Sequence, residues 1–121
     1  MSQATDLTSH IQALIEADAS LVSKLHKSWF YVGVPQTLPS VYIDGLYVTD
    51  DKQDTWRFNI SFVTNDMSLN GLAIAQQVKA ALQQSDCVLA QTIAVRPETE
   101  NKRTRYLIPC SAYMRVLSQK P

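Results

Sequence analysis

The chain has 121 residues, of which 45% are hydrophobic and 18% charged, and its eleven acidic residues balance eleven Lys and Arg residues. This length predicts a single domain, 1–121, with one hydrophobic core, because it is too short for two ordinary domains. The composition argues against a disordered chain, and the balanced charge argues against a protein built to neutralise phosphates, so we expect no sequence-specific nucleic acid partner.

The charge is distributed unevenly along the chain. Residues 1–94 hold five basic and nine acidic side chains, whereas residues 95–121 hold six basic and two acidic ones, which gives net charges of −4 and +4. This polarity is either accidental or a means by which one copy attracts another. Residues 1–6 do not resemble a secretory leader, and no run of about 18 apolar residues is present, so we expect a cytoplasmic protein without a membrane partner.

The beginning of the chain predicts an amphipathic helix that lays one apolar stripe on a sheet. The side chains of that stripe are Leu7, Ile11, Leu14 and Ile15. A short helical turn is expected at 20–26, followed by an extended segment at 29–32. Pro35 and Pro39 then mark a loop.

Two strands, 40–48 and 55–64, are predicted to form a long hairpin around the acidic connection 50–54. The second strand alternates between large apolar and polar side chains, so one of its faces should be buried and the other available to water or a partner. The apolar set is Trp56, Phe58, Ile60 and Phe62, and the polar set is Arg57, Asn59 and Ser61.

Ser68 is expected to cap a helix whose apolar stripe ends near 85–86, with Gly71 weakening its first turn. Two further strands, 87–95 and 103–117, should form a second hairpin around the polar connection 97–102. Pro109 cannot donate a hydrogen bond between strands, which favours a sheet edge or a bulge at that point. The fold class that follows is α+β: a four- to five-stranded, largely antiparallel sheet with two amphipathic helices packed on one face.

Residue spacing gives no sign of catalytic, cofactor-binding or metal-binding chemistry. His10 and His26 lack nearby cysteines or carboxylates at ligand spacing and are interpreted as surface residues. Cys87 and Cys110 are interpreted as buried apolar residues. The three glycines are dispersed, and the acidic connection 50–54 lacks the glycine and glutamate of a calcium loop. We therefore expect a protein that is not an enzyme.

The polar outer face of the sheet and the tips of the hairpins suit assembly with other proteins. The alternative, that these side chains only keep the sheet soluble, stays open. Candidate interface residues, chosen from strand faces and hairpin tips, are Asp50, Asp51, Asp54, Arg57, Lys102, Arg103, Arg105, Tyr113 and Arg115.

Segments 31–36 (Tyr-Val-Gly-Val-Pro-Gln) and 38–42 (Leu-Pro-Ser-Val-Tyr) resemble the tail-completion, or tail-terminator-like, proteins of long-tailed bacteriophages and prophages. The order of elements resembles that family across nearly the whole chain. The resemblance implies a homo-oligomeric ring, typically a hexamer, that ends tail-tube polymerisation at the head-proximal end and prepares the tail for head joining. It also implies a structural protein without cofactors, located in the virion tail and assembled in the cytoplasm of the bacterial host.

The implied partners are other copies of the chain, the tail tube protein and the head–tail connector protein. Two alternatives stay open: a connector or neck subunit, which also forms a ring, and a small ligand-binding or enzymatic α+β domain. A deep apolar pocket with converging polar groups would favour the latter.

Overall fold

A computed structural model describes residues 3–50 and 55–114 and contains three helices, one 3-10 turn and six strands. In chain order these are α1 (Gln3–Glu16), α2 (Ala19–Val22), β1 (Phe30–Val32), β2 (Ser40–Asp50), β3 (Thr55–Thr64), η1 (Leu69–Gly71), α3 (Leu72–Leu82), β4 (Val88–Ala90), β5 (Ala94–Glu98) and β6 (Arg103–Tyr113).

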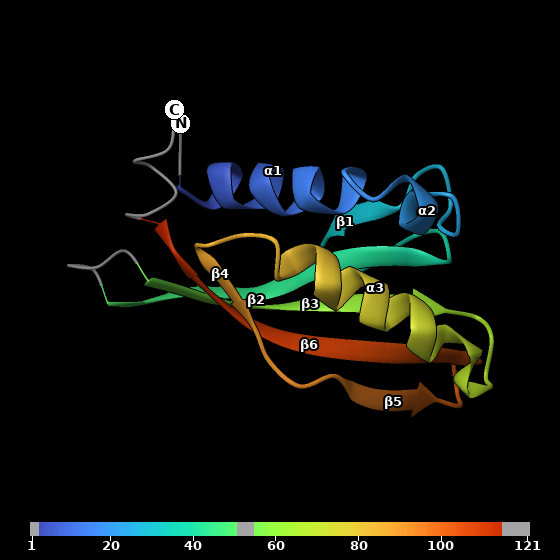
Figure 1. The fold of residues 1–121 in the computed structure, drawn as a ribbon. Helices are drawn as coiled ribbons and strands as arrows, with labels where there is room; N and C mark the ends of the chain where they lie inside the picture. Colours follow the sequence, from blue (N-terminus) through green and yellow to red (C-terminus); the bar gives the residue numbers. More distant parts are fainter. Residues whose placement is uncertain (1–2, 51–54, 115–121) are drawn as a thin grey trace.

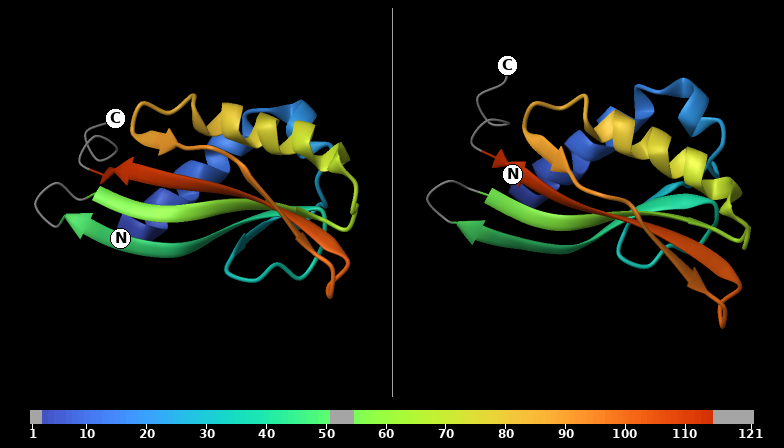
Figure 2. Two further views of the ribbon diagram at one scale, coloured as in Figure 1. Left: turned by 90° about the horizontal axis from the view of Figure 1, so that it is seen from below. Right: turned by 60° about the horizontal axis from the view of Figure 1, so that its bottom comes forward.

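The strands form one sheet in the order β1-β2-β3-β6-β4, with β5 also pairing with β6. The β1–β2 pair is parallel and the other pairs are antiparallel. Helices α1 and α3 lie on the same face of this sheet, and within the described residues no helix covers the opposite face, which we call the open face (Figures 1 and 2). The α+β prediction is confirmed, although the sheet has six strands rather than four or five.

The extra strands arise at two places. The extended segment at 29–32 joins the sheet as β1, and the single strand predicted at 87–95 is instead two short strands, β4 and β5. Both pair with β6, and the gap between them lies opposite Pro109, because β4 ends at the Ala90–Cys110 pair and β5 begins at the Ala94–Leu107 pair. Proline has no N–H to donate, so the ladder is interrupted there. The Gln91 N–H still donates to the Pro109 carbonyl at 2.9 Å.

The second hairpin is shorter at its tip than predicted, since Pro97 lies within β5 and the turn covers only 99–102. Other boundaries agree closely with the predictions. Strand β3 covers the predicted 55–64, and the Ser68 side chain accepts the Asn70 N–H and so caps the 3-10 turn that leads into α3. The predicted continuation of the last strand to 117 lies partly outside the described residues.

The core lies between the helices and the covered face of the sheet. Strand β3 contributes Phe58, Ile60 and Phe62, all buried as predicted, whereas Trp56 is only half-buried. Trp56 lies against the start of α1, where its indole N–H donates to the Gln3 side-chain oxygen at 2.9 Å. The other large, fully buried side chains of this core are Leu7, Ile11, Ile15, Leu21, Val41, Ile43, Leu82, Tyr106 and Ile108.

Gly71 has a packing role that its helix propensity does not suggest. A Cβ atom at this position would lie 2.8 Å from Cε2 of Tyr106, which is itself fully buried. The absence of a side chain therefore lets the beginning of α3 lie directly on the Tyr106 ring.

We expect Phe58→Ala to lower the free energy of unfolding by about 3–5 kcal/mol, because the substitution leaves a cavity beneath the helices. Reversible urea denaturation measures the change. Val32→Ala is the matched control, since Val32 is 64% exposed and its truncation should change stability by less than about 0.5 kcal/mol. A loss below about 1 kcal/mol for Phe58→Ala would contradict the assignment of the core.

Candidate functional site

The open face carries Arg57, Arg105 and Tyr113, three of the residues predicted to form an interface. Arg57 and Tyr113 are exposed on it, and Asn59 is half-exposed. Ser61 was expected to be available to a partner on this face, and that expectation is wrong because Ser61 is fully buried. Ser61 is covered by the side chain of Arg105, which extends from β6 across β3.

Arg105 crosses the open face from β6 over β3 to β2. Its Nε donates to the Ser61 hydroxyl at 3.1 Å, and its guanidinium carbon lies 5.6 Å from the centre of the Tyr42 ring. The Asp44 carboxylate is 3.7 Å from Arg105 Nη2 in a partly exposed ion pair. Arg105 therefore stabilises its own sheet, and only its remaining exposed part is free to meet a neighbour.

Arg103 also has a partner within the chain. Its Nε donates to the Glu98 carboxylate at 2.7 Å, and both side chains are partly exposed. This ion pair links β5 to β6 directly below the turn 99–102, so it holds the tip of the second hairpin. Lys102 is exposed in that turn, with a positive φ of 52°.

The turn 99–102 and the strand ends that flank the acidic connection lie at opposite ends of the sheet. Thr55, which follows the acidic connection, pairs with Tyr113, whereas Thr64 pairs with Thr104 beside the other turn. Figure 1 shows this separation along the length of β3 and β6. Asp51, Asp54 and the Arg115 position lie outside the described residues, as does the side chain of Asp50, so their predicted interface roles stay predictions.

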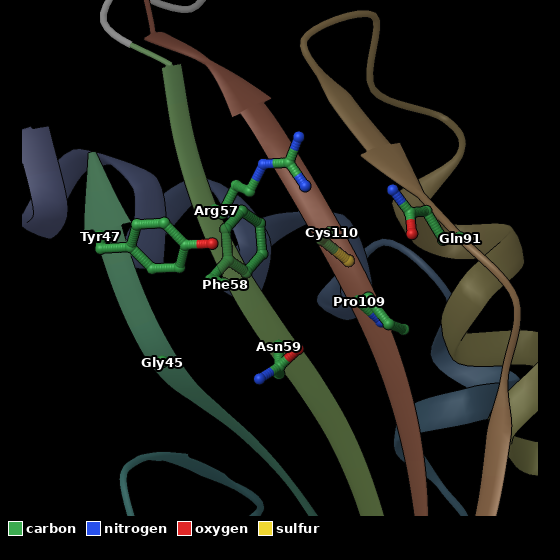
Figure 3. A pocket seen from close by; sticks show the side chains of 8 residues that line it. All are labelled: Gly45, Tyr47, Arg57, Phe58, Asn59, Gln91, Pro109 and Cys110. Atoms are coloured by element: carbon green, nitrogen blue, oxygen red, sulfur yellow. The ribbon is translucent and has the colours of Figure 1, made fainter. Parts of the chain in front are cut away.

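A hollow of about 180 Å³ opens on the open face beside Arg57, and we call it the Arg57 hollow. Gly45 and Tyr47 of β2, Arg57 and Asn59 of β3, Pro109 of β6 and Gln91 of the β4–β5 connection are among the residues that line it. Figure 3 shows Tyr47 and Gln91 on its two sides and Arg57 between them.

Two irregularities in the backbone shape the Arg57 hollow. The bulge in β2 between Asp44 and Tyr47 contains Gly45 with φ +65°, and a Cβ there would lie 3.0 Å from the Asn59 amide nitrogen. The interruption opposite Pro109 places Gln91 on the other side. Sequence reasoning did not find Gly45, Tyr47 or Gln91, although Pro109 signalled the interruption.

His10, Ser85 and Cys87 meet where α1 approaches the connection from α3 to β4. His10 Nε2 lies 2.9 Å from the Ser85 hydroxyl oxygen and 3.5 Å from the Cys87 sulfur, and the two latter atoms are 3.1 Å apart. His10 is half-buried by these contacts, and its neighbouring cysteine comes from a distant part of the sequence, so sequence spacing gave no sign of it. Cys87 is only 1% exposed, which leaves its thiol without the access that a nucleophile needs.

The remaining histidine and cysteine have local roles. His26 Nδ1 accepts the Ser28 N–H at 3.0 Å. Cys110 is buried in β6, as predicted, and burial raises the pKa of its thiol to about 12, so almost no thiolate forms at neutral pH.

Among the described residues, no three His, Cys, Asp or Glu side chains gather as they would around a metal ion, and no helix is long and apolar enough to cross a bilayer.

Comparison with solved structures finds eleven matching chains. One belongs to a structure entitled "Virion of native gene transfer agent (GTA) particle", with a TM-score of 0.64, 18% sequence identity and coverage of 92% of this chain and 96% of that chain. The likeness shows a shared fold over almost the full length of both chains. No family model and no curated protein sequence matches this chain.

We expect Arg105→Met to lower the free energy of unfolding by about 1–3 kcal/mol, because the buried Ser61 hydroxyl loses its donor. Adding Ser61→Ala should recover part of that loss, since both hydrogen-bonding groups are then gone. A double-mutant cycle in urea measures the coupling. Arg96→Met, an exposed arginine on β5, is the control and should change stability by less than about 0.5 kcal/mol. Purely additive effects at 105 and 61 would contradict the cross-strand role.

Replacing all imidazoles and thiols should leave assembly intact, because none of them is expected to bind metal or react. The variant combines His10→Gln, His26→Gln, Cys87→Ala and Cys110→Ala. It should be less stable than the wild type, since two buried thiols and the His10–Ser85 contact are lost. Elemental analysis of the purified wild type is the companion measurement: stoichiometric metal that disappears in the variant would overturn the structural interpretation.

Proposed function

We propose that this chain is a structural protein of a phage-like virion and not an enzyme. The observation that carries the proposal is the fold shared with a chain of a gene transfer agent virion over 92% of this chain and 96% of that chain. The shared fold extends over almost the full length of both compared chains.

Within the virion, the proposed role is tail termination. About six copies form a ring at the head-proximal end of the tail tube, stop polymerisation of the tube protein and offer a surface to the head–tail connector protein. The sequence resemblance at 31–42 supports this role. That segment forms β1, the following loop and the beginning of β2, with the Tyr31 hydroxyl hydrogen-bonded to Thr37 at 2.6 Å and Thr37 donating to the Ser28 carbonyl at 2.9 Å.

The arrangement of the surfaces also supports a ring. A closed ring with head-to-tail contacts needs two different complementary surfaces on each copy. The basic segment 102–105 begins at one end of the sheet, and Asp50 and Thr55, which flank the acidic connection, lie at the other end. Strands of 11 residues separate the two ends by about 35 Å. One copy can therefore present its basic end to the acidic end of the next.

Electron microscopy of particles made without this protein tests the proposed role. We expect tails of abnormal, extended length that lack heads, because nothing ends growth of the tube. Supplying the wild-type chain should restore tails of normal length that carry heads, whereas the Phe58→Ala variant should restore fewer in proportion to its loss of folded protein.

The same experiment separates the connector alternative, which shares the supporting likeness to a virion chain. Tails of normal length that remain detached from heads indicate a connector or neck subunit. Particles of normal length, with heads attached and full infectivity or transfer, would reject both virion roles.

A further inference from the structure

The Arg57 hollow contains an unusual concentration of hydrogen-bond donors. The Arg57 guanidinium, the amides of Asn59 and Gln91 and the Tyr47 hydroxyl all border it, and none of the described residues that line it is acidic. Within the described part of the chain, Arg57 has neither an ion pair nor a hydrogen-bonded partner for its side chain. Figure 3 shows its guanidinium held above β6 between Tyr47 and Gln91.

We infer that the Arg57 hollow binds the Glu100 carboxylate of a second copy of this chain, an inference that rests on the proposed ring. The chemistry of the hollow selects a carboxylate, since guanidinium and amide N–H groups bind carboxylate oxygens in charge-assisted and often bidentate hydrogen bonds. The size of the hollow, about 180 Å³, suits one side chain. Pockets for free drug-sized ligands are larger, at about 300–1,000 Å³.

Among the described acidic residues, Glu100 is the one best placed to enter such a hollow. It is exposed in the turn 99–102, and Figure 2 shows this hairpin projecting beyond the rest of the sheet. Its neighbour Glu98 is already paired with Arg103, which fixes the turn below it. Within the described residues Glu100 has no partner of its own.

The other described acidic residues are engaged or lie in the helical layer. Asp18 caps α2, Asp44 pairs with Arg105, Asp66 accepts from Ser68 and Asn70, and Asp86 has a partner. Asp6 and Glu16 belong to α1, on the side of the sheet opposite the hollow.

The contact must form between two copies. Pro109 beside the hollow is six residues from Arg103 at the beginning of β6, which corresponds to about 20 Å along an extended strand. A rigid hairpin therefore cannot return its tip to the hollow of its own chain. A tip and a hollow at different places on each copy make a head-to-tail contact, which is the type that closes into rings.

Sedimentation equilibrium at low salt, with and without tail tubes, tests the contact on the full chain. We expect Arg57→Glu and Glu100→Arg each to lower the association constant by about tenfold or more, as for other close charge pairs at interfaces. The double variant should recover most of that loss because it restores opposite charges. Matched controls are Arg96→Glu on β5 and Glu16→Arg on α1, both exposed, and each should associate as the wild type does.

The outcomes separate this contact from the ring. If the wild type associates and both single variants associate equally well, the Glu100 contact is overturned. The proposed ring is not contradicted by that result. Weakening by Arg57→Glu alone, without recovery in the double variant, means that the hollow binds a different carboxylate and also overturns the inference. A wild type that stays monomeric even with tail tubes removes the ring and the contact together.

Discussion

The pairing of β3 with β6 is the constraint on which the rest of the molecule depends. Ten consecutive residue pairs, from Thr55–Tyr113 to Thr64–Thr104, fix which side chains face the helices and which face outward. Along this ladder Pro109 pairs with Asn59 of β3. Toward the opposite neighbour of β6, Pro109 has no N–H to donate, so the strand that pairs with β6 on that side is divided into β4 and β5. One imino acid in a central strand thus determines the outline of the sheet edge and brings the β4–β5 connection beside the open face.

Local patterns predicted the layers of this fold, because alternation in strands and helical spacing depend only on the chain itself. The burial of Phe58, Ile60 and Phe62 followed from that alternation, and so did the burial of Cys110 in β6. The burial of Ser61 could not be predicted from that alternation. Ser61 is covered by Arg105, which lies 44 residues later in the sequence and reaches Ser61 from the neighbouring strand. The meeting of His10 with Cys87, 77 residues apart, was equally beyond any local pattern. A side chain long enough to reach over a neighbouring strand can bury an outward-facing residue of that strand.

The sequence predicted that charged residues would lie on the candidate site, but it did not predict which of them are paired within the chain. Choosing charged residues from strand faces identified Arg57, whose side chain has no partner among the described residues. It also identified Arg103 and Arg105, which are paired within the chain. Sequence gives the sign of a charge but not whether a partner in the same chain already neutralises it. Only the free charges retain their full capacity for contacts with other proteins. For a protein proposed to act by shape and assembly, this distinction separates residues that build the subunit from residues that can join it to another.

The irregular course of β2 has a consequence for the solubility of the free chain. Strand β1 covers β2 only at Val41–Ile43, so the rest of β2 has no strand on its outer side within the described chain. Tyr47 and Val48 are exposed there, a combination that in a flat strand invites edge-to-edge aggregation. Register shifts between Asp44 and Tyr47 and after Val48 interrupt that edge. Such bulges twist a strand away from regular pairing, which should keep separate copies of this chain from stacking edge to edge into fibres.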